Sequence, residues 1–200
     1  MKIKKLSICH VNVRSLLSQT RLLELEILTA SHSIDVLCLS ETWLSADRAP
    51  SSSNIMLPGF QLAARRDRAV GRGGGVAIYV RNGVAAAALP LLCSVECVGV
   101  QLSFEKRGKF NVITAYRPPC SSMFDFIDDL ESCLFEGGAL AHHPLCLVGD
   151  FNCKSAQWWN GQSDSADGRL LECFAAEHNL LQVVDGPTHG VCGNCPLSST

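Results

Sequence analysis

Hydrophobic residues in this chain fall either into short apolar runs or into stretches with helical spacing. The apolar runs predict β-strands at Leu6–Val13, Ile34–Leu39, Phe60–Ala64, Gly75–Arg81, Cys97–Phe104, Phe110–Tyr116 and Pro144–Gly149. Helical spacing predicts helices at Ser15–Ser31, Ser122–Phe135 and Gly168–Asn179. In the first of these, the expected buried face consists of Leu16, Leu17, Leu23, Ile27 and Leu28. Strands interspersed with helices are typical of an α/β domain.

Glycine-containing turns separate the strands in the middle of the chain. Turns at 71–75, 82–83 and 107–108 join consecutive strands, so this part is expected to be antiparallel. Residues 45–59 are rich in Ser and Pro and predict a surface loop. We expect one domain over residues 1–186, followed by an irregular Gly, Cys and Ser tail over residues 187–200.

Composition narrows the class of protein further. With 200 residues, 47% of them hydrophobic and 18% charged, the chain can bury one sizeable core, which excludes disorder, collagen and coiled coil. The net charge of −2 means that any nucleic-acid partner must be held by a local basic patch. The longest apolar run, residues 84–95, contains Pro90 and is too short to span a bilayer, so no membrane association is expected.

The cysteines bear on the compartment. There are 11 of them, an odd number scattered from Cys9 to Cys195, without the compact even pattern of a disulfide scaffold. The N-terminus has no secretory leader pattern. These features predict a reducing compartment, nuclear or cytoplasmic, in which most of the cysteines serve as small core residues.

Polar side chains follow three of the predicted strands at their carboxyl ends. Asn12, Glu41 and the pair Asp150 and Asn152 hold these positions, where α/β sheets build their sites. Period-two spacing would point Asp150 and Asn152 to one face and Phe151 into the core. Carboxylate and amide oxygens suit Mg²⁺, with Mn²⁺ as the alternative ion, and a phosphate ester is the natural substrate of such a site. Each residue alone could instead be a turn or cap residue.

Five motifs occur in order along the chain: Asn12–Leu16 (NVRSL), Leu39–Leu44 (LSETWL), Gly71–Ile78 (GRGGGVAI), Ala115–Pro119 (AYRPP) and Gly149–Asn152 (GDFN). Together they resemble the endonuclease/exonuclease/phosphatase superfamily over nearly the whole chain. The NVRSL, ETWL and YRPP motifs most resemble the apurinic-type endonuclease domain of non-LTR (LINE-like) retrotransposons. The resemblance implies a four-layer α/β sandwich with two mixed β-sheets.

The same resemblance implies a role for each matching residue. Glu41 would coordinate the catalytic Mg²⁺, with Asn12 beside it. Asp150 would activate the attacking water, Asn152 would hold the scissile phosphate, and Tyr116 would contact the phosphate or the leaving group. The implied reaction nicks target DNA and leaves a 3′-hydroxyl that primes reverse transcription, so the implied partners are DNA and the reverse transcriptase region of a parent polyprotein.

The sequence departs from the family in one respect. The family ends in a Ser-Asp-His motif, which this sequence does not contain, and His189 resembles a different family segment. We therefore expect a C-terminally truncated domain that lacks its last strands and has impaired catalysis. Two alternatives remain: another phosphoesterase of the same fold, or a catalytically inactive remnant that binds DNA.

Two weaker signals concern DNA and zinc. Between residues 65 and 81, five arginines against Asp67 give a net charge of +4, which favours phosphate contacts or equally an ordinary solvated face. His189, Cys192 and Cys195 have the spacing of three zinc ligands, but no fourth ligand is evident. The residues expected to contact DNA are Arg65, Arg66, Arg68, Arg72 and Arg117.

Overall fold

The computed structural model describes residues 5–45, 55–69, 71–105, 108–136, 140, 143–155 and 165–184. Its strands are β1 (Ile8–Asn12), β2 (Val36–Ser40), β3 (Phe60–Arg66), β4 (Val76–Arg81), β5 (Ala85–Leu89), β6 (Glu96–Phe104), β7 (Gly108–Tyr116) and β8 (Leu145–Asp150). Its helices are α1 (Gln19–His32), α2 (Met123–Glu131), the short π-helix η2 (Ser132–Glu136) and α3 (Ala166–Glu177). The expected boundary between a domain at 1–186 and a tail at 187–200 lies outside the described residues.

The strands form two four-stranded mixed sheets, in the orders β1-β2-β4-β3 and β5-β6-β7-β8. In the first sheet β1 and β2 are parallel, whereas β4 is antiparallel to both β2 and β3. In the second sheet β5, β6 and β7 are antiparallel, and β7 and β8 are parallel. Each sheet therefore contains one parallel pair, β1 with β2 and β7 with β8. The candidate site lies where these two pairs end.

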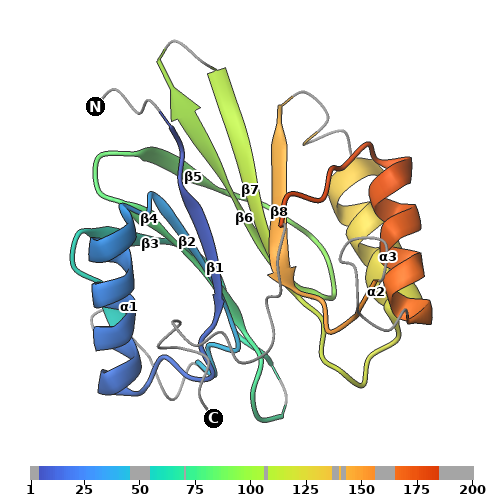
Figure 1. Cartoon of the computed structure of the whole chain (residues 1–200), viewed down its shortest axis with the longest axis horizontal. Helices are drawn as coiled ribbons and strands as arrows, with labels where there is room; N and C mark the ends of the chain where they lie inside the picture. Colours follow the sequence, from blue (N-terminus) through green and yellow to red (C-terminus); the bar gives the residue numbers. More distant parts are fainter. Residues whose placement is uncertain are drawn as a thin grey trace.

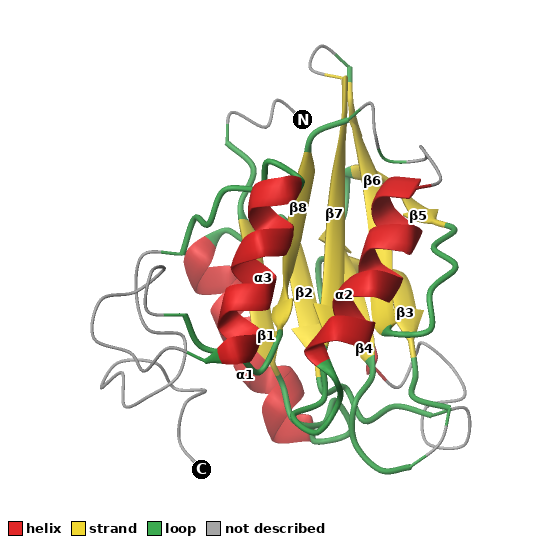
Figure 2. Cartoon of the chain, turned by 90° about the vertical axis from the view of Figure 1, so that its right-hand side faces the viewer, coloured by secondary structure: helices red, strands yellow, loops and turns green. Residues whose placement is uncertain are grey.

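Four layers stack in the order α1, first sheet, second sheet, and the pair α2 and α3 (Figure 1). Turning the molecule by 90° shows α2 and α3 covering the outer face of the second sheet (Figure 2). The predicted four-layer α/β sandwich with two mixed sheets is confirmed.

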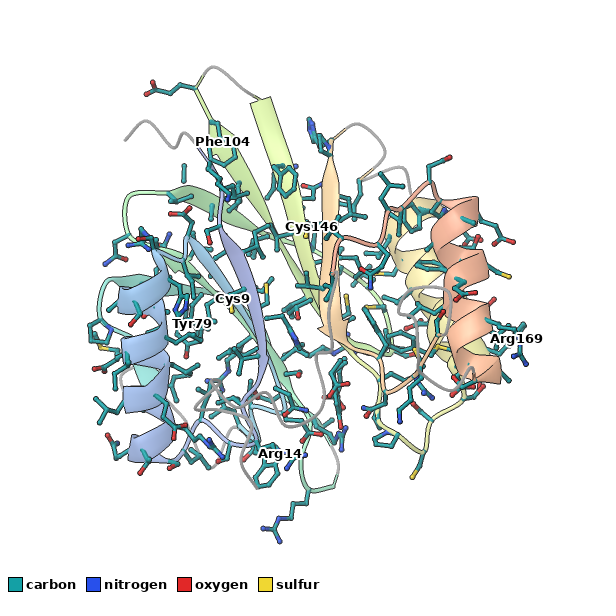
Figure 3. All side chains as sticks on the ribbon, viewed as in Figure 1. Cys9, Arg14, Tyr79, Phe104, Cys146 and Arg169 are labelled. Carbon is teal, nitrogen blue, oxygen red and sulfur yellow. The ribbon has the colours of Figure 1, made fainter. Side chains whose placement is uncertain are left out.

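Three apolar cores fill the spaces between the layers, as the side chains in Figure 3 show. One lies between α1 and the first sheet and includes Leu25 and Leu37, and a second lies between the two sheets and includes Ile78 and Val100. The third lies between the second sheet and the helices α2 and α3. Because both faces of each sheet are covered, central strands such as β2 and β4 are continuous apolar runs.

The predicted buried face of the first helix was wrong in part. Leu23 and Ile27 are 55% and 57% exposed, whereas Leu22, Leu25 and Thr29 are the buried residues of α1. The helix begins at Gln19, after a separate turn that buries Leu16. Apolar residues occur on two sides of this helix, so sequence spacing alone could not decide which side packs on the sheet.

The strand β5 was not predicted. It consists of four alanines and a leucine, which lack the β-branched and aromatic side chains typical of strands. It is an edge strand, and pairing with β6 from Ala85↔Ser103 to Leu89↔Gly99 is what holds it extended. None of the helices formed by the described residues is long and apolar enough to cross a membrane.

Candidate active site at the strand ends

Four of the predicted site residues lie where the two parallel strand pairs end. Asn12 is the last residue of β1, and Glu41 directly follows β2. Tyr116 and Asp150 are the last residues of β7 and β8 and are register partners. Because parallel strands end at the same edge of a sheet, each pair brings its two polar residues together.

Hydrogen bonds link these four residues across the sandwich. Asn12 Nδ2 donates to Asp150 Oδ2 at 2.8 Å and thereby joins the first sheet to the second. The Tyr116 hydroxyl donates to Glu41 Oε1 and joins the two sheets a second time. Residues separated by 138 and 75 positions in the sequence thus form one polar cluster between the sheet edges.

The Glu41 carboxylate is held by several donors. Burial raises its pKa, but hydrogen bonds from the side chains of Tyr116 and Trp43 and from the Gly74 backbone N–H lower it, as does the charge of Arg68. The donors outweigh burial, so the pKa of Glu41 lies below its usual value. Glu41 is therefore an anion at neutral pH, as a metal ligand must be.

Tyr116 shows the complementary effect. Burial, the hydrogen bond to Glu41 and the charge of Glu41 raise the pKa of its hydroxyl well above the usual value. The hydroxyl therefore keeps its proton at any physiological pH and acts as a hydrogen-bond donor.

Backbone strain is concentrated at this edge of the sandwich. Glu41, Trp43 and Asn152 have φ values of 57°, 55° and 48°, and Arg14 and Ser15, just after β1, have 46° and 98°. Non-glycine residues with positive φ are uncommon, and they cluster at functional sites where the surrounding structure holds them. The strain marks the same strand ends that the polar residues mark.

Asp150 and Asn152 are arranged differently from the period-two expectation. The strand β8 ends at Asp150, and Asn152 lies in a left-handed turn whose N–H donates to Asp150 Oδ1 at 3.2 Å. Asn152 Nδ2 donates to the Arg117 carbonyl oxygen at 2.8 Å. The turn interpretation of this pair is thus partly correct, although both residues still border the cluster. Phe151 packs toward the helices, with its ring 6.0 Å from that of Phe126.

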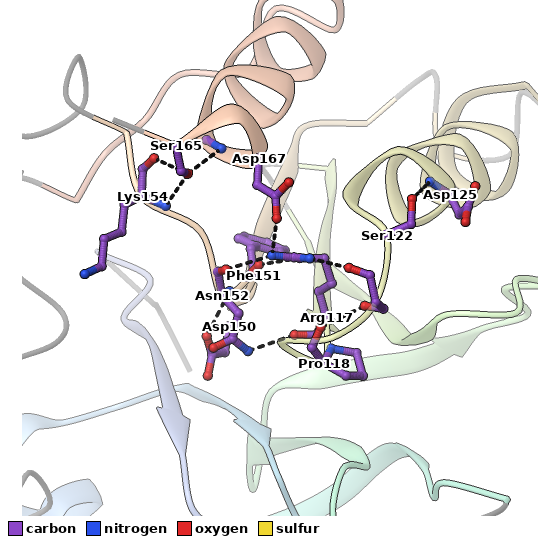
Figure 4. A network of polar contacts seen from close by, with 12 residues as sticks. Arg117, Pro118, Ser122, Asp125, Asp150, Phe151, Asn152, Lys154, Ser165 and Asp167 are labelled. Atoms are coloured by element: carbon purple, nitrogen blue, oxygen red, sulfur yellow. Dashed lines mark hydrogen bonds and ion pairs between the residues drawn. The ribbon is translucent and has the colours of Figure 1, made fainter. Parts of the chain in front are cut away.

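Arg117 is a structural residue, which corrects its assignment as a DNA contact. Its side chain is 1% exposed, and it donates to the carbonyl oxygens of Phe151 at 2.7 Å, Asn152 at 2.7 Å and Ser121 at 2.5 Å (Figure 4). Asp167 of α3 completes the arrangement with an ion pair at 2.8 Å. The guanidinium is buried and fully engaged, so it cannot reach a phosphate; instead it fixes the backbone around Asn152.

The remaining predicted DNA contacts are largely engaged within the protein. Arg65 pairs with Asp67, and Arg66 donates to the carbonyl oxygens of Cys93 and Ser94. Arg72 is exposed and lies over the Trp43 ring at 5.8 Å. Of the four, Arg72 is best placed to meet a ligand in solvent.

Arg68 belongs to a set of contacts among Arg68, Glu96 and the 71–75 turn that the sequence did not indicate. Glu96 accepts hydrogen bonds from Arg68 Nε at 2.6 Å and from the Gly75 N–H, while Glu41 accepts one from the Gly74 N–H at 3.1 Å. The turn at 71–75 was predicted, and positive φ values confirm it. Gly74 has a φ of 69°, a conformation that favours glycine, and a Cβ there would lie 2.4 Å from the Arg68 guanidinium carbon and displace that side chain.

Glu96 had no signal in the sequence. It is the first residue of β6 and the register partner of Tyr116, a placement that only the sheet pairing reveals. A pocket of about 260 Å³ adjoins both residues and extends to Pro118, Ser122 and Phe126 near the start of α2.

The oxygen atoms of the cluster fit a hard divalent cation. Asn12 Oδ1 is buried and has no hydrogen-bond partner, and it lies in the same cluster as the carboxylates of Asp150 and Glu41. Mg²⁺ binds through one or two carboxylates and keeps several waters, so such a set is sufficient. No group of three or more His, Cys, Asp or Glu side chains in the described part of the chain forms a complete metal cage. Residues 189, 192 and 195 lie outside that part.

Comparisons with known proteins bear on the family and the fold of the chain. The model of the endonuclease/exonuclease/phosphatase family matches residues 9–196. No curated protein sequence matches the chain significantly.

Among solved structures, the chain is similar to the endonuclease domain of TRAS1, a telomere-specific non-LTR retrotransposon, with a TM-score of 0.69, 19% identity, and coverage of 94% of this chain and 79% of that one. It is also similar to the AP endonuclease LMAP from Leishmania major, with a TM-score of 0.65, 16% identity, and coverage of 87% and 67%. A further similar structure is the 3′ phosphatase NExo from Neisseria bound to a product DNA hairpin, with a TM-score of 0.58, 19% identity, and coverage of 86% and 71%.

At these identities the likeness shows a shared fold, whereas the family match extends over most of the sequence. Three observations agree: the family match, the ordered motifs, and the strand-end cluster of Asn12, Glu41, Tyr116 and Asp150. The chain belongs to the endonuclease/exonuclease/phosphatase family, a superfamily of hydrolases.

Proposed function

We propose that this chain is a divalent-metal-dependent DNA endonuclease domain of the non-LTR retrotransposon type. The observation that carries the proposal is the bridging of the two sheets by Asn12 with Asp150 and by Tyr116 with Glu41. The retrotransposon type is supported by the NVRSL, ETWL and YRPP motifs and by the similarity to the TRAS1 endonuclease domain.

Mg²⁺, or Mn²⁺ in its place, would be held by Glu41 with the free Asn12 amide oxygen beside it. When bound, such an ion neutralises charge that develops on the phosphate oxygens. The protein contributes an anionic Glu41 whose orientation is fixed by Tyr116, Trp43 and the Gly74 N–H, so the ligand does not reorganise during the reaction.

Asp150 is the proposed base for the attacking water. Asn12 holds one of its oxygens and the Asn152 N–H holds the other, which orients the carboxylate at the cluster edge. The carboxylate accepts a proton as the water oxygen bonds to phosphorus, while the bond between phosphorus and the 3′-oxygen breaks and that oxygen leaves and is protonated to the 3′-hydroxyl. Asn152 has a second N–H for a phosphate oxygen, because only one is used on the Arg117 carbonyl.

Tyr116 is the proposed donor on the phosphate or leaving-group side. Its hydroxyl stays protonated and already points into the cluster, toward Glu41. The product with a free 3′-hydroxyl would serve the reverse transcriptase of the parent element, which is the proposed partner besides DNA. We also propose nuclear or cytoplasmic localisation, because the scattered cysteines lack the pattern of a disulfide scaffold and favour a reducing compartment.

A plasmid-nicking assay tests this proposal. The purified chain is incubated with supercoiled DNA and Mg²⁺, with EDTA as the metal-free arm, and compared with Glu41→Gln and Asp150→Asn. Loss of a positioned base typically costs about 10²- to 10⁴-fold in rate, and we expect a loss of that size for Asp150→Asn. Arg21→Ala, which removes a half-buried ion pair to Glu24 on α1, is the matched control and should nick at the wild-type rate.

Two outcomes would contradict the proposal. Wild-type nicking that persists in both site variants would mean that the strand-end cluster is not the active site. A folded wild-type chain that binds DNA in a salt-sensitive way without cutting it would favour the inactive remnant. A substrate panel with a 3′-phosphate hairpin and a duplex containing an abasic site separates the endonuclease from another phosphoesterase of the same fold.

A further inference from the structure

Three cysteines form a thiol cluster near the start of β6, on the helix-covered side of the second sheet. Cys93 lies in the loop between β5 and β6, Cys97 lies in β6, and Cys133 lies in η2. The Cys93 thiol interacts with the side chains of both Cys97 and Cys133. All three belong to the apolar core between the second sheet and its helices, so packing brings them together.

A guanidinium lies against this cluster. Arg66 Nη1 is 3.7 Å from Cys93 Sγ and donates to the Cys93 carbonyl oxygen at 2.6 Å, and Nη2 donates to the Ser94 carbonyl oxygen at 3.2 Å. These two backbone contacts fix the guanidinium next to the sulfur. The negative charge of Asp129 opposes the effect of Arg66 on Cys93. Its carboxylate accepts a hydrogen bond from the Val95 N–H at 2.7 Å.

The electrostatics of the three thiols differ because of this arrangement. Hydrogen bonding from Cys97, together with that from Cys133 and the charge of Arg66, outweighs burial and lowers the pKa of Cys93 to about 6. Donating to Cys93 raises the pKa of Cys97, which burial raises further. Burial and the hydrogen bond to Cys93 raise the pKa of Cys133 to about 12. Of the three thiols, Cys93 is therefore the one that loses its proton most easily.

We propose that Cys93 is an oxidation-sensitive thiolate and that peroxide converts it into a disulfide within the Cys93, Cys97 and Cys133 cluster. No disulfide joins Cys93, Cys97 and Cys133 in the structure. Cys93 and Cys133 are half-buried and within reach of a small oxidant, while Cys97 is buried. The interpretation of the cysteines as core residues holds for Cys93, which packs against the core, but not for Cys120 and Cys173, which are exposed.

The chemistry takes two steps with hydrogen peroxide as the oxidant. The Cys93 thiolate attacks one peroxide oxygen, an S–O bond forms, the O–O bond breaks, and hydroxide leaves and is protonated to water. The sulfur of Cys97 or Cys133 then attacks the sulfenic acid, an S–S bond forms, the S–O bond breaks, and the hydroxide leaves as water with the thiol proton. Two thiols are oxidised, and one peroxide is reduced to two waters.

The cluster is not a metal site. Among the described residues, no group of three or more His, Cys, Asp or Glu side chains is arranged to hold a metal ion, and this includes Cys93, Cys97 and Cys133. Two of the three also remain protonated, which disfavours thiolate ligation.

The first experiment measures the pH dependence of alkylation for each cysteine of the intact reduced chain, with iodoacetamide and peptide mass spectrometry. We expect a midpoint near pH 6 for Cys93, well below the value of about 8.5 that is usual for a cysteine in a model peptide, and the exposed Cys120 and Cys173 are alkylated in parallel for comparison. Arg66→Met removes the neighbouring charge and should move the Cys93 midpoint upward.

The second experiment titrates hydrogen peroxide at pH 7, blocks the free thiols and maps disulfides. Wild type should yield one bond from Cys93 to Cys97 or Cys133, reversible by dithiothreitol. Cys93→Ser should abolish it, and Cys97→Ser and Cys133→Ser identify the partner. Cys146→Ser, at a half-buried position on β8, is the matched control and should leave the bond intact.

Either of two results would overturn the proposal. One is an alkylation midpoint for Cys93 that equals those of Cys120 and Cys173. The other is a peroxide titration that oxidises the exposed cysteines first while Cys93 stays a free thiol. Neither experiment depends on nuclease activity, so the proposed function can fail without affecting this inference.

Discussion

Arg117→Ala removes a buried cation that ties the backbone at Ser121 to the backbone at Phe151 and Asn152. The guanidinium is 1% exposed and donates to the carbonyl oxygens of Ser121, Phe151 and Asn152, in addition to its ion pair with Asp167. Alanine leaves these carbonyl groups without their donor in the space between β7, β8 and α3. The partner Asp167 is 41% exposed and can be solvated, so its loss of the pair costs little.

The expected loss of stability follows from the number of unsatisfied groups. A buried acceptor left without its donor costs about 1–3 kcal/mol, and breaking a buried charged arrangement typically costs about 3–5 kcal/mol. The individual terms are not additive because the chain relaxes, so we expect about 3–5 kcal/mol in total. For a chain of this size, each kcal/mol lowers Tm by about 2–4 °C, which gives a decrease of about 6–20 °C.

Urea and thermal unfolding followed by circular dichroism measure this loss. Arg117→Lys keeps the charge but not the planar fork of donors, so it should fall between wild type and alanine. Arg21→Ala, which breaks a single helix ion pair with Glu24, is the control, with an expected cost of about 0.3–0.5 kcal/mol. A free energy of unfolding for Arg117→Ala within about 1 kcal/mol of wild type would refute the reasoning, because the carbonyl groups would then be satisfied without the guanidinium.

Two further predictions concern packing and pH. A Cβ at Gly149 would lie 1.9 Å from the Ala115 carbonyl oxygen on β7, so Gly149→Ala must push β8 away and should lower the free energy of unfolding in urea by about 1–3 kcal/mol or more. Gly108→Ala is the control for backbone strain alone, because Gly108 has a positive φ but open space around it. An equal loss of stability in both variants would contradict the packing argument. Burial lowers the pKa of His10 from 6.5 to about 4, against the attraction of Asp150. The folded state therefore favours the neutral ring. The contribution of His10 to the free energy of unfolding is present above pH 6.5 and is lost as the pH falls from 6.5 toward 4, by on the order of 3 kcal/mol. His10→Leu should flatten the stability profile between pH 4 and 6.5, and a variant as steep as wild type would assign the dependence to other groups.

Local pattern determined much of this protein. Apolar runs identified seven of the strands, because a strand covered on both faces, as β2 and β4 are, must be apolar throughout. The polar residues after those runs are the ones that the structure brings together, since parallel strands end at a common edge. A site built at strand ends is legible in the sequence because its residues directly follow recognisable strands.

Other features depended on partners distant in sequence. The pairing of Ala85–Leu89 with β6, the packing of Leu22 and Leu25 in place of Leu23 and Ile27, and the burial of Arg117 all depend on neighbours contributed by other elements. The same holds for Glu96 beside Tyr116 and for the three thiols of Cys93, Cys97 and Cys133. Periodicity records which residues are apolar, whereas sheet order and register decide which side chains meet, and that choice is made only when the whole sandwich packs.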